Sequence, residues 1–208
     1  MAKTRSRLRI RAAREGAPGP AGAPLAIVSG LPRSGTSLLM QMLAAGGLPP
    51  LSDGLRAPDE SNPRGYLEWE PVKRIREDPA LLVQARGRVL KVVSALLPEL
   101  PSQHRYRVLF ATRPTAEIQA SQRAMLRARG LADDRLSEAE LEGHLDAMRA
   151  WMRLQPNLET CFVSYPELLA DPIVVARRMR VFLDCELDVE SMAAVVDPRL
   201  SHWGCGSR

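Results

Sequence analysis

The sequence predicts an α/β fold in which a parallel β-sheet is flanked by helices on both faces, giving three layers. Short, nearly continuous apolar runs alternate with longer amphipathic segments, a pattern typical of buried parallel strands joined by helices. The first apolar run leads directly into a glycine-containing loop and then a helix, all within residues 25–47. The 208 residues are enough for one domain with a single sizeable core.

Apolar periodicity, caps and stops predict the individual elements. Strands are expected at the apolar runs 25–28, 88–93, 106–112 and 159–164. Helices are expected at 38–45, 71–86, 115–130, 136–154, 172–183 and 189–196. Pro71 suits a first helical position, and Ser137 with Glu140 three residues later has the spacing of a capping box. The stretch 48–70 is rich in Pro, Gly, Asp and Asn, and we expect a long loop that forms a wall of a substrate site.

The positive charge is concentrated at the amino terminus. Six lysines and arginines precede the first acidic residue, Glu15, and the other 23 basic residues face 24 acidic ones, so the remainder carries a net charge of −1. We expect residues 1–24 to be a disordered basic arm and residues 25–208 to be the folded domain. A targeting segment, or an arm that contacts an acidic partner, is the alternative. The balanced charge of the domain argues against a nucleic-acid partner.

The composition predicts a cytoplasmic protein. No apolar run approaches the ~20 residues that a membrane helix needs, and the amino terminus has no apolar centre of a secretory signal. The three cysteines, Cys161, Cys185 and Cys205, fit neither a disulfide framework nor a zinc site, because they are odd in number and widely spaced. The sequence does not indicate an oligomeric state.

The segment from Gly30 to Ser37, GLPRSGTS, predicts an anion site of the P-loop type. A glycine-containing loop before a helix gathers backbone N–H groups around one point, which suits a phosphate or a sulfate. The segment nearly fits the nucleotide-binding pattern GxxxxGK(S/T), but Thr36 stands where that pattern needs lysine, and a cation occurs three positions earlier as Arg33. The missing lysine argues against phosphoryl transfer from ATP or GTP.

A second anion-binding residue is predicted just after the third strand. Arg113 follows the apolar run 106–112 directly, and ligands bind beyond the carboxyl ends of parallel strands. The guanidinium group has a planar set of donors that matches a phosphate. Ser121 lies eight residues further on, within the predicted helix.

GLPRSGTS resembles the loop of the PAPS-dependent sulfotransferases, whose versions read like PKSGTT or RSGTT (PAPS is 3′-phosphoadenosine 5′-phosphosulfate). The resemblance, to a short member of bacterial type, implies that the loop grips the 5′-phosphosulfate through residues Arg33, Ser34, Gly35, Thr36 and Ser37. It also implies that Arg113 and Ser121 hold the 3′-phosphate, because family members carry Arg and Ser at this spacing. VSYPELLADP (163–172) resembles the family segment whose tyrosine reaches the adenine, which gives that role to Tyr165.

The sequence departs from the family pattern at the catalytic base. Many cytosolic members carry Lys-Thr-His after the second strand, with the histidine as base, whereas here Lys91 is kept and Val93 stands at the histidine position. Other branches use a glutamate from the region after the first helix. Four acids lie there in this chain: Asp59, Glu60, Glu68 and Glu70. We rank Glu68 first, because its apolar neighbours would raise its pKa, and Glu60 second.

The sequence thus predicts a sulfotransferase that moves the sulfuryl group of PAPS to a hydroxyl or amine of a small-molecule, glycan or lipid acceptor. Arg33 and the loop N–H groups would stabilise the leaving phosphate, Lys91 would assist, and a carboxylate would take the acceptor proton. No metal is expected, because cations and N–H dipoles replace it.

Three alternatives stay open. A non-catalytic PAPS or PAP sensor would keep the anion-binding residues without a base. A P-loop nucleotide kinase would need lysine at position 36 and an acidic magnesium ligand. A nucleic-acid-binding role would depend on residues 1–24 alone.

Overall fold

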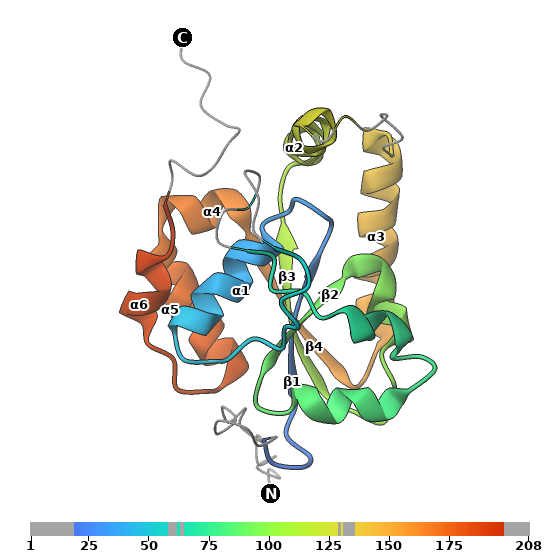
Figure 1. Ribbon diagram of the computed structural model, residues 1–208, viewed down its shortest axis with the longest axis vertical. Coiled ribbons are helices and arrows are strands. Elements are labelled where there is room, and N and C mark those ends of the chain that lie inside the picture. The colour runs from blue at the N-terminus through green and yellow to red at the C-terminus, as the bar shows by residue number, and fades with distance from the viewer. Residues whose placement is uncertain (1–18, 58–61, 63–64, 129, 131–135, 198–208) are drawn as a thin grey trace, which may run out of the picture.

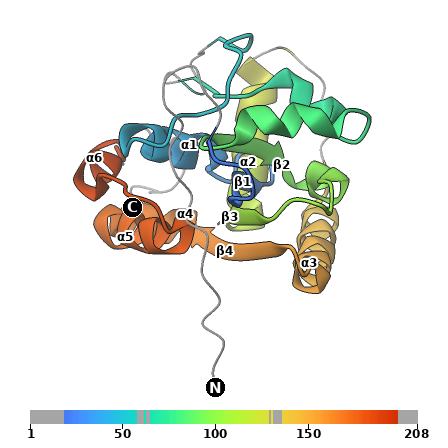
Figure 2. The ribbon, with the colours of Figure 1, turned by 90° about the horizontal axis from the view of Figure 1, so that it is seen from below.

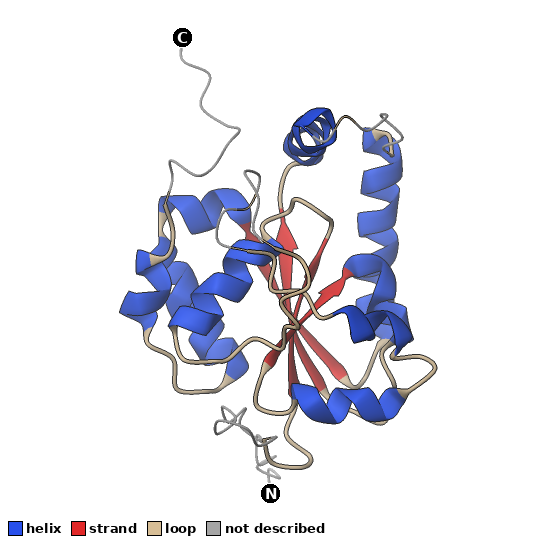
Figure 3. Cartoon of the chain, in the orientation of Figure 1, coloured by secondary structure: helices blue, strands red, loops and turns tan. Residues whose placement is uncertain are grey.

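The computed structural model confirms the predicted α/β fold class. The residues that it describes are 19–57, 62, 65–128, 130 and 136–197. Within them, four strands form one sheet in the order β2-β1-β3-β4, and every neighbouring pair is parallel (Figures 1 and 3). The strands are β1 (Leu25–Gly30), β2 (Val89–Val93), β3 (Tyr106–Thr112) and β4 (Leu158–Ser164).

The register brings the carboxyl ends of the strands to one edge of the sheet. Gly30, the last residue of β1, pairs with Val93 of β2 and with Ala111 of β3. Ser164 of β4 pairs with Thr112, so the fourth strand ends at the same level. In the sheet, β2 lies on one side of β1, and β3 lies on the other side of β1. The carboxyl edge at β1 and β3 is therefore a topological switch point, where open parallel sheets bind ligands.

Helices cover both faces of the sheet, which explains why the strands read as continuous apolar runs. One face carries the helices drawn at the left of Figure 1: α1 (Thr36–Ala45), α4 (Tyr165–Ala170), α5 (Pro172–Leu183) and α6 (Val189–Ala194). The other face packs against three 3₁₀ helices and two α-helices: η1 (Glu70–Arg74), η2 (Pro79–Ala85), η3 (Ser94–Glu99), α2 (Thr115–Ala128) and α3 (Glu138–Leu154). Figure 2 shows the sheet between the two groups. Ile27 belongs to the core on the second face and Val28 to the core on the first.

The prediction of one helix over 71–86 is wrong. The chain forms η1 and η2 there, separated by a turn. Pro79 has no N–H and disfavours helical dihedrals at Asp78, which lies at φ −130° and ψ 82°. The Asp78 side chain then accepts a hydrogen bond from the N–H of Ala80 and starts the second element. The short elements η3 and α4 were not predicted, whereas the other expected helices and strands are confirmed to within a few residues.

Several predictions on the termini concern residues outside the described ones. Residues 1–18 of the expected arm and Cys205 are among them, so the arm stays a prediction. At the start of the described chain, the N–H of Gly19 donates to the carbonyl of Arg86 at 2.8 Å. Cys161 and Cys185 are both free thiols. No helix of the described chain has the length and apolar character needed to cross a bilayer.

The capping box at the start of α3 gives a test of the fold. The Ser137 hydroxyl accepts from the N–H of Glu140, and the Glu140 carboxylate accepts from the N–H of Ser137. We expect Ser137→Ala to lower the free energy of unfolding by about 1 kcal/mol, because the first turn of α3 loses its acceptor. Urea unfolding measures the loss. Ser137→Thr keeps the hydroxyl and should retain most of the stability; an equal loss in both variants would contradict the role of the cap.

Candidate functional site

The loop between β1 and α1 has a tightly curved backbone. Gly30, Arg33 and Gly35 all have positive φ, at 149°, 75° and 106°. A Cβ at Gly30 would lie 2.6 Å from the Ser34 hydroxyl oxygen and 2.8 Å from the carbonyl oxygen of Ala111, so only glycine fits there. Ser34 is buried, and its hydroxyl donates to the carbonyl of Leu31 at 2.7 Å. Its side chain therefore stabilises the loop.

The N-terminus of α1 is open to an anion. Four other α-helices begin with a side chain that accepts from a first-turn N–H; these caps are Ser137, Ser164, Asp171 and Asp188. In the described chain, α1 instead begins at Gly35 with no side-chain cap and with no acidic residue in its first turn. The N–H groups of a first turn have no acceptor within the helix, and the helix dipole favours negative charge at this end. The geometry of this end is therefore that of a phosphate or sulfate site.

Two arginines meet beside this loop. Arg33 Nε donates to the Ser121 hydroxyl at 2.9 Å, and Arg113 Nη1 donates to the carbonyl of Arg33 at 3.4 Å. Glu117 fixes the Arg113 side chain through a 2.8 Å bond to its Nε. Segments eighty residues apart in sequence are thus in direct contact. Ser121 belongs to α2, so the hydrogen bond to its hydroxyl directs the Arg33 guanidinium toward that helix.

Tyr165 connects the loops that follow three of the strands. The Arg113 guanidinium carbon lies 4.4 Å from the centre of the tyrosine ring, a cation–π contact. The ring edge covers Gly35 so closely that an added Cβ would come within 2.6 Å of it. Burial raises the pKa of the Tyr165 hydroxyl, which therefore stays protonated at neutral pH.

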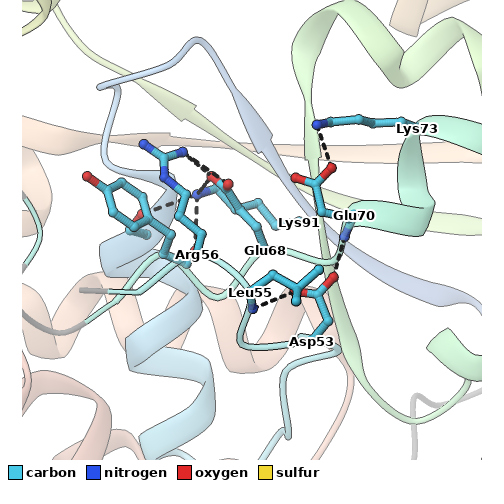
Figure 4. Close-up of polar contacts among 9 residues, drawn as sticks. Asp53, Leu55, Arg56, Glu68, Glu70, Lys73 and Lys91 are labelled. Carbon is cyan, nitrogen blue, oxygen red and sulfur yellow. Dashed lines mark hydrogen bonds and ion pairs between the residues drawn. The ribbon is translucent and has the colours of Figure 1, made fainter. Parts of the chain in front are cut away.

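A buried lysine approaches the same loop from β2. Lys91 is 8% exposed, and its ammonium group donates to the Ser37 hydroxyl at 3.2 Å, to the carbonyl of Tyr66 at 3.2 Å and to Glu68 Oε1 at 3.0 Å. Glu68 also accepts from Arg56 Nη1, at 3.1 and 3.0 Å to its two oxygens, and the Arg56 guanidinium stacks 3.5 Å from the Tyr66 ring centre (Figure 4). Glu68 is thus shared by two cations, Arg56 from its own loop and Lys91 from β2.

This network changes the protonation of both partners. Burial lowers the pKa of Lys91, since it disfavours the ammonium form, and Glu68 opposes that effect. Burial by itself would raise the pKa of Glu68, but the charges and hydrogen bonds of Lys91 and Arg56 outweigh it and hold that pKa below its usual value. The expected increase in the Glu68 pKa is therefore wrong. Burial is the largest single effect on this pKa, but the combined effect of the two cations exceeds it.

A second carboxylate holds the segment that carries Arg56. Asp53 accepts from the N–H of Leu55 at 3.0 Å and from the N–H of Glu70 at 2.6 Å (Figure 4). These hydrogen bonds keep the pKa of Asp53 low. They also join the two ends of the predicted loop, so that Arg56 is placed over Glu68.

One cavity of about 450 Å³ unites these groups. Nine predicted site residues line it: Arg33, Gly35, Thr36, Ser37, Glu68, Lys91, Arg113, Ser121 and Tyr165. Ser34 is buried behind the loop, and Glu60 lies outside the described residues. Among the described residues, five cationic side chains (Arg33, Arg56, Lys73, Lys91, Arg113) and three acidic ones (Glu68, Glu70, Asp197) line the cavity. The excess of positive charge favours an anionic ligand.

Sequence reasoning missed two groups of lining residues. Arg56 is not among the predicted site residues. The signal for it is its position: it is a cation in the predicted wall, twelve residues before the predicted base Glu68. Apolar side chains that line the cavity were also missed: Trp69, Val72, Val93, Leu96 and Met125. Nothing in their local sequence distinguishes them from ordinary core residues.

The contact between Gly35 and Tyr165 can be tested through stability. Gly35→Ala places a Cβ at positive φ, which costs roughly 1–2 kcal/mol, and forces the ring to move, which costs about 1–3 kcal/mol more. Gly54→Ala is the matched control, because Gly54 also has positive φ but has nothing within 4 Å of the added Cβ. Urea unfolding should show the larger loss for Gly35→Ala. Equal losses would mean that the Tyr165 ring yields without cost.

No protein-family model matches the sequence, and no curated protein matches it. Among solved structures, a mouse sulfotransferase complexed with PAP has a TM-score of 0.48 at 17% identity, over 90% of this chain and 65% of that one. The sulfotransferase domain from the curacin biosynthetic pathway has a TM-score of 0.44 at 15% identity, over 90% of this chain and 79% of that one. A sulfotransferase from Alicyclobacillus acidocaldarius has a TM-score of 0.47 at 16% identity, over 85% of this chain and 87% of that one. This chain spans less than two thirds of the mouse protein. Solved sulfotransferases, bacterial ones included, are thus among the structures similar to this chain.

Proposed function

We propose that the protein is a sulfotransferase that binds PAPS and transfers its sulfuryl group to an acceptor hydroxyl or amine. The observation that carries the proposal is the uncapped N-terminus of α1, which opens into a cavity with an excess of cationic side chains. The resemblance of GLPRSGTS to the sulfotransferase loop supports the same ligand.

The residues of the cavity fit a ligand with two separate anionic groups. The first-turn N–H groups of α1 and the ammonium of Lys91 meet at Ser37, and they would bind the 5′-phosphosulfate. Arg113 and Ser121 form a second position, which would bind the 3′-phosphate. Arg33 belongs to both positions, because its backbone forms the loop while its side chain bonds Ser121. Tyr165 lies beside the second position and would contact the adenine.

Catalysis would then depend on a cation and a base at one point. When bound, PAPS supplies an activated sulfuryl group whose leaving group is a phosphate. Lys91 would stabilise the negative charge that develops on that phosphate. Glu68 would take the proton of the acceptor hydroxyl or amine, since its carboxylate is ionised at neutral pH and bonded to Lys91. Arg56 would hold the Glu68 carboxylate in place.

The non-catalytic sensor remains the second candidate. Glu68 is bonded to two cations and its pKa is lowered, which makes it a weaker base than the sequence predicts. The kinase reading is less favoured, because Lys91 places a positive charge against the Ser37 hydroxyl, the group that would have to bind magnesium in a P-loop kinase.

Calorimetry with PAP tests the anion site. We expect the native chain to bind PAP, and Arg33→Ala and Arg113→Ala to bind it at least about tenfold more weakly, because each loses charge-assisted hydrogen bonds. Arg149→Ala is the matched control, since Arg149 lies on the surface of α3 and pairs with Asp146. No binding by the native chain would refute the enzyme and the sensor together. Unimpaired binding by Arg113→Ala would refute its assignment to the 3′-phosphate.

Glu68→Gln tests the base and its electrostatic link to Lys91. Turnover of PAPS should fall by about 10²-fold or more while PAP still binds at pH 7, and the sensor predicts no turnover in either protein.

PAP affinity of the native chain should fall at alkaline pH as Lys91 loses its proton. In the variant this fall should move to lower pH, because burial lowers the pKa of Lys91 and the carboxylate that opposes it is gone. An unchanged alkaline limb would contradict the coupling.

A further inference from the structure

We propose that Asp53 is a positioning residue for the proposed base, which acts from outside the cavity by fixing the backbone at both Glu68 and Arg56. This inference rests on the proposed function and adds to it a residue that touches no ligand. Asp53 is exposed and does not line the cavity, and the motifs of the sequence do not include it. Its hydrogen bonds are the observation that assigns the role.

Asp53 binds the backbone next to the Glu68 side chain through two hydrogen bonds. Its N–H donates to the carbonyl of Glu68 at 3.2 Å, and its carboxylate oxygen Oδ2 accepts from the N–H of Glu70 at 2.6 Å. One residue thus satisfies both an acceptor and a donor of the same segment, which fixes the distance and the orientation between the two parts of the loop. The position of the Glu68 backbone is therefore set by a group that is not in the cavity.

The same carboxylate fixes the turn that leads to Arg56. Its oxygen Oδ1 accepts from the N–H of Leu55 at 3.0 Å, and the Ser52 hydroxyl accepts from the N–H of Gly54 at 3.3 Å. Burial does not hold this turn, because Gly54 and Arg56 are exposed and the Leu55 side chain is 74% exposed. The turn therefore depends on hydrogen bonds, and those of Asp53 join it to the segment that carries Glu68 (Figure 4).

Arg56 transmits the effect of Asp53 to the Glu68 carboxylate. The charged groups that line the cavity with Glu68 are Arg33, Arg56, Glu70, Lys73, Lys91, Arg113 and Asp197. Of these, Arg56 and Lys91 bond Glu68, while Glu70 is paired with Lys73 at 2.6 Å (Figure 4). If the turn is released, Glu68 keeps Lys91 but loses the cation that contacts both of its oxygens. The carboxylate then loses part of the charge that keeps it ionised.

An NMR titration of the glutamate carboxyl carbons tests this placement without any ligand, with Glu68→Gln to identify the signal. Asp53→Ala should raise the pKa of Glu68, because Arg56, which lowers that pKa, is no longer held over it. Loss of the Asp53 charge alone would lower the pKa, so the sign separates positioning from long-range electrostatics. Asp78→Ala is the matched control, since the Asp78 carboxylate also accepts from a backbone N–H, that of Ala80 at 3.2 Å, and does not line the cavity. An unchanged or lowered Glu68 pKa in Asp53→Ala, or an equal rise in the control, would overturn the inference.

A double variant tests whether Asp53 acts through Arg56. Arg56→Ala should raise the pKa of Glu68 by itself, and adding Asp53→Ala should then raise it little further. Full additivity of the two rises would contradict the proposed link.

Turnover tests the consequence for the proposed reaction. In Asp53→Ala the acid limb of kcat should move to higher pH and kcat at pH 7 should fall roughly tenfold, because the base is misplaced and protonated more easily. PAP affinity at pH 7 should stay unchanged, and Asp53→Asn, which keeps one acceptor oxygen, should lie between the two proteins. An unmoved acid limb would refute the role of Asp53 and leave the proposed function standing. A native chain that binds PAP without turnover would refute the enzyme, and the NMR titration would still decide whether Asp53 sets the state of Glu68.

Discussion

Parallel pairing of β1 with both β2 and β3 is the constraint on which the rest of the molecule depends. Because Gly30 pairs with Val93 and with Ala111, the loops after these strands begin at the same level. The open end of α1, the lysine of β2 and the arginine after β3 are thereby brought to one point. A shift of β2 by one residue would turn Lys91 to the opposite face, and the ammonium could not reach Ser37.

A buried ammonium group in such a place needs a counterion, and Glu68 supplies it. The cost of burying Lys91 is offset by the carboxylate at 3.0 Å, and Lys91 together with Arg56 keeps that carboxylate ionised. In the proposed reaction the same three residues hold the positive charge and the base next to each other. The loop that carries Arg56 is in turn fixed by Asp53, so a long irregular segment becomes a defined wall.

Local sequence predicted helices and strands well where one pattern, such as a continuous apolar run or a helix cap, marked the element. Buried strands, the Ser137 capping box and the glycine stop after α1 were all correctly placed. The segment 71–86 was misjudged because its periodicity continues through Pro79, whose missing N–H breaks the helix. The motif predicts a ligand contact for Ser34 through its backbone N–H, but it does not predict that the Ser34 hydroxyl donates to the Leu31 carbonyl. A motif gives the order of residues along the backbone, whereas the direction of each side chain depends on its neighbours in space.

The sequence by itself determined the fold class and the glycine-containing loop between β1 and α1, because strand burial and the backbone conformation of a short loop are local properties. Only the tertiary structure decided the protonation of Glu68, the bond between Arg33 and Ser121, and which apolar side chains line the cavity. Each of these depends on groups contributed by distant segments. Electrostatic energy and exposure are set by distances in space, and those distances exist only once the sheet has aligned its strands.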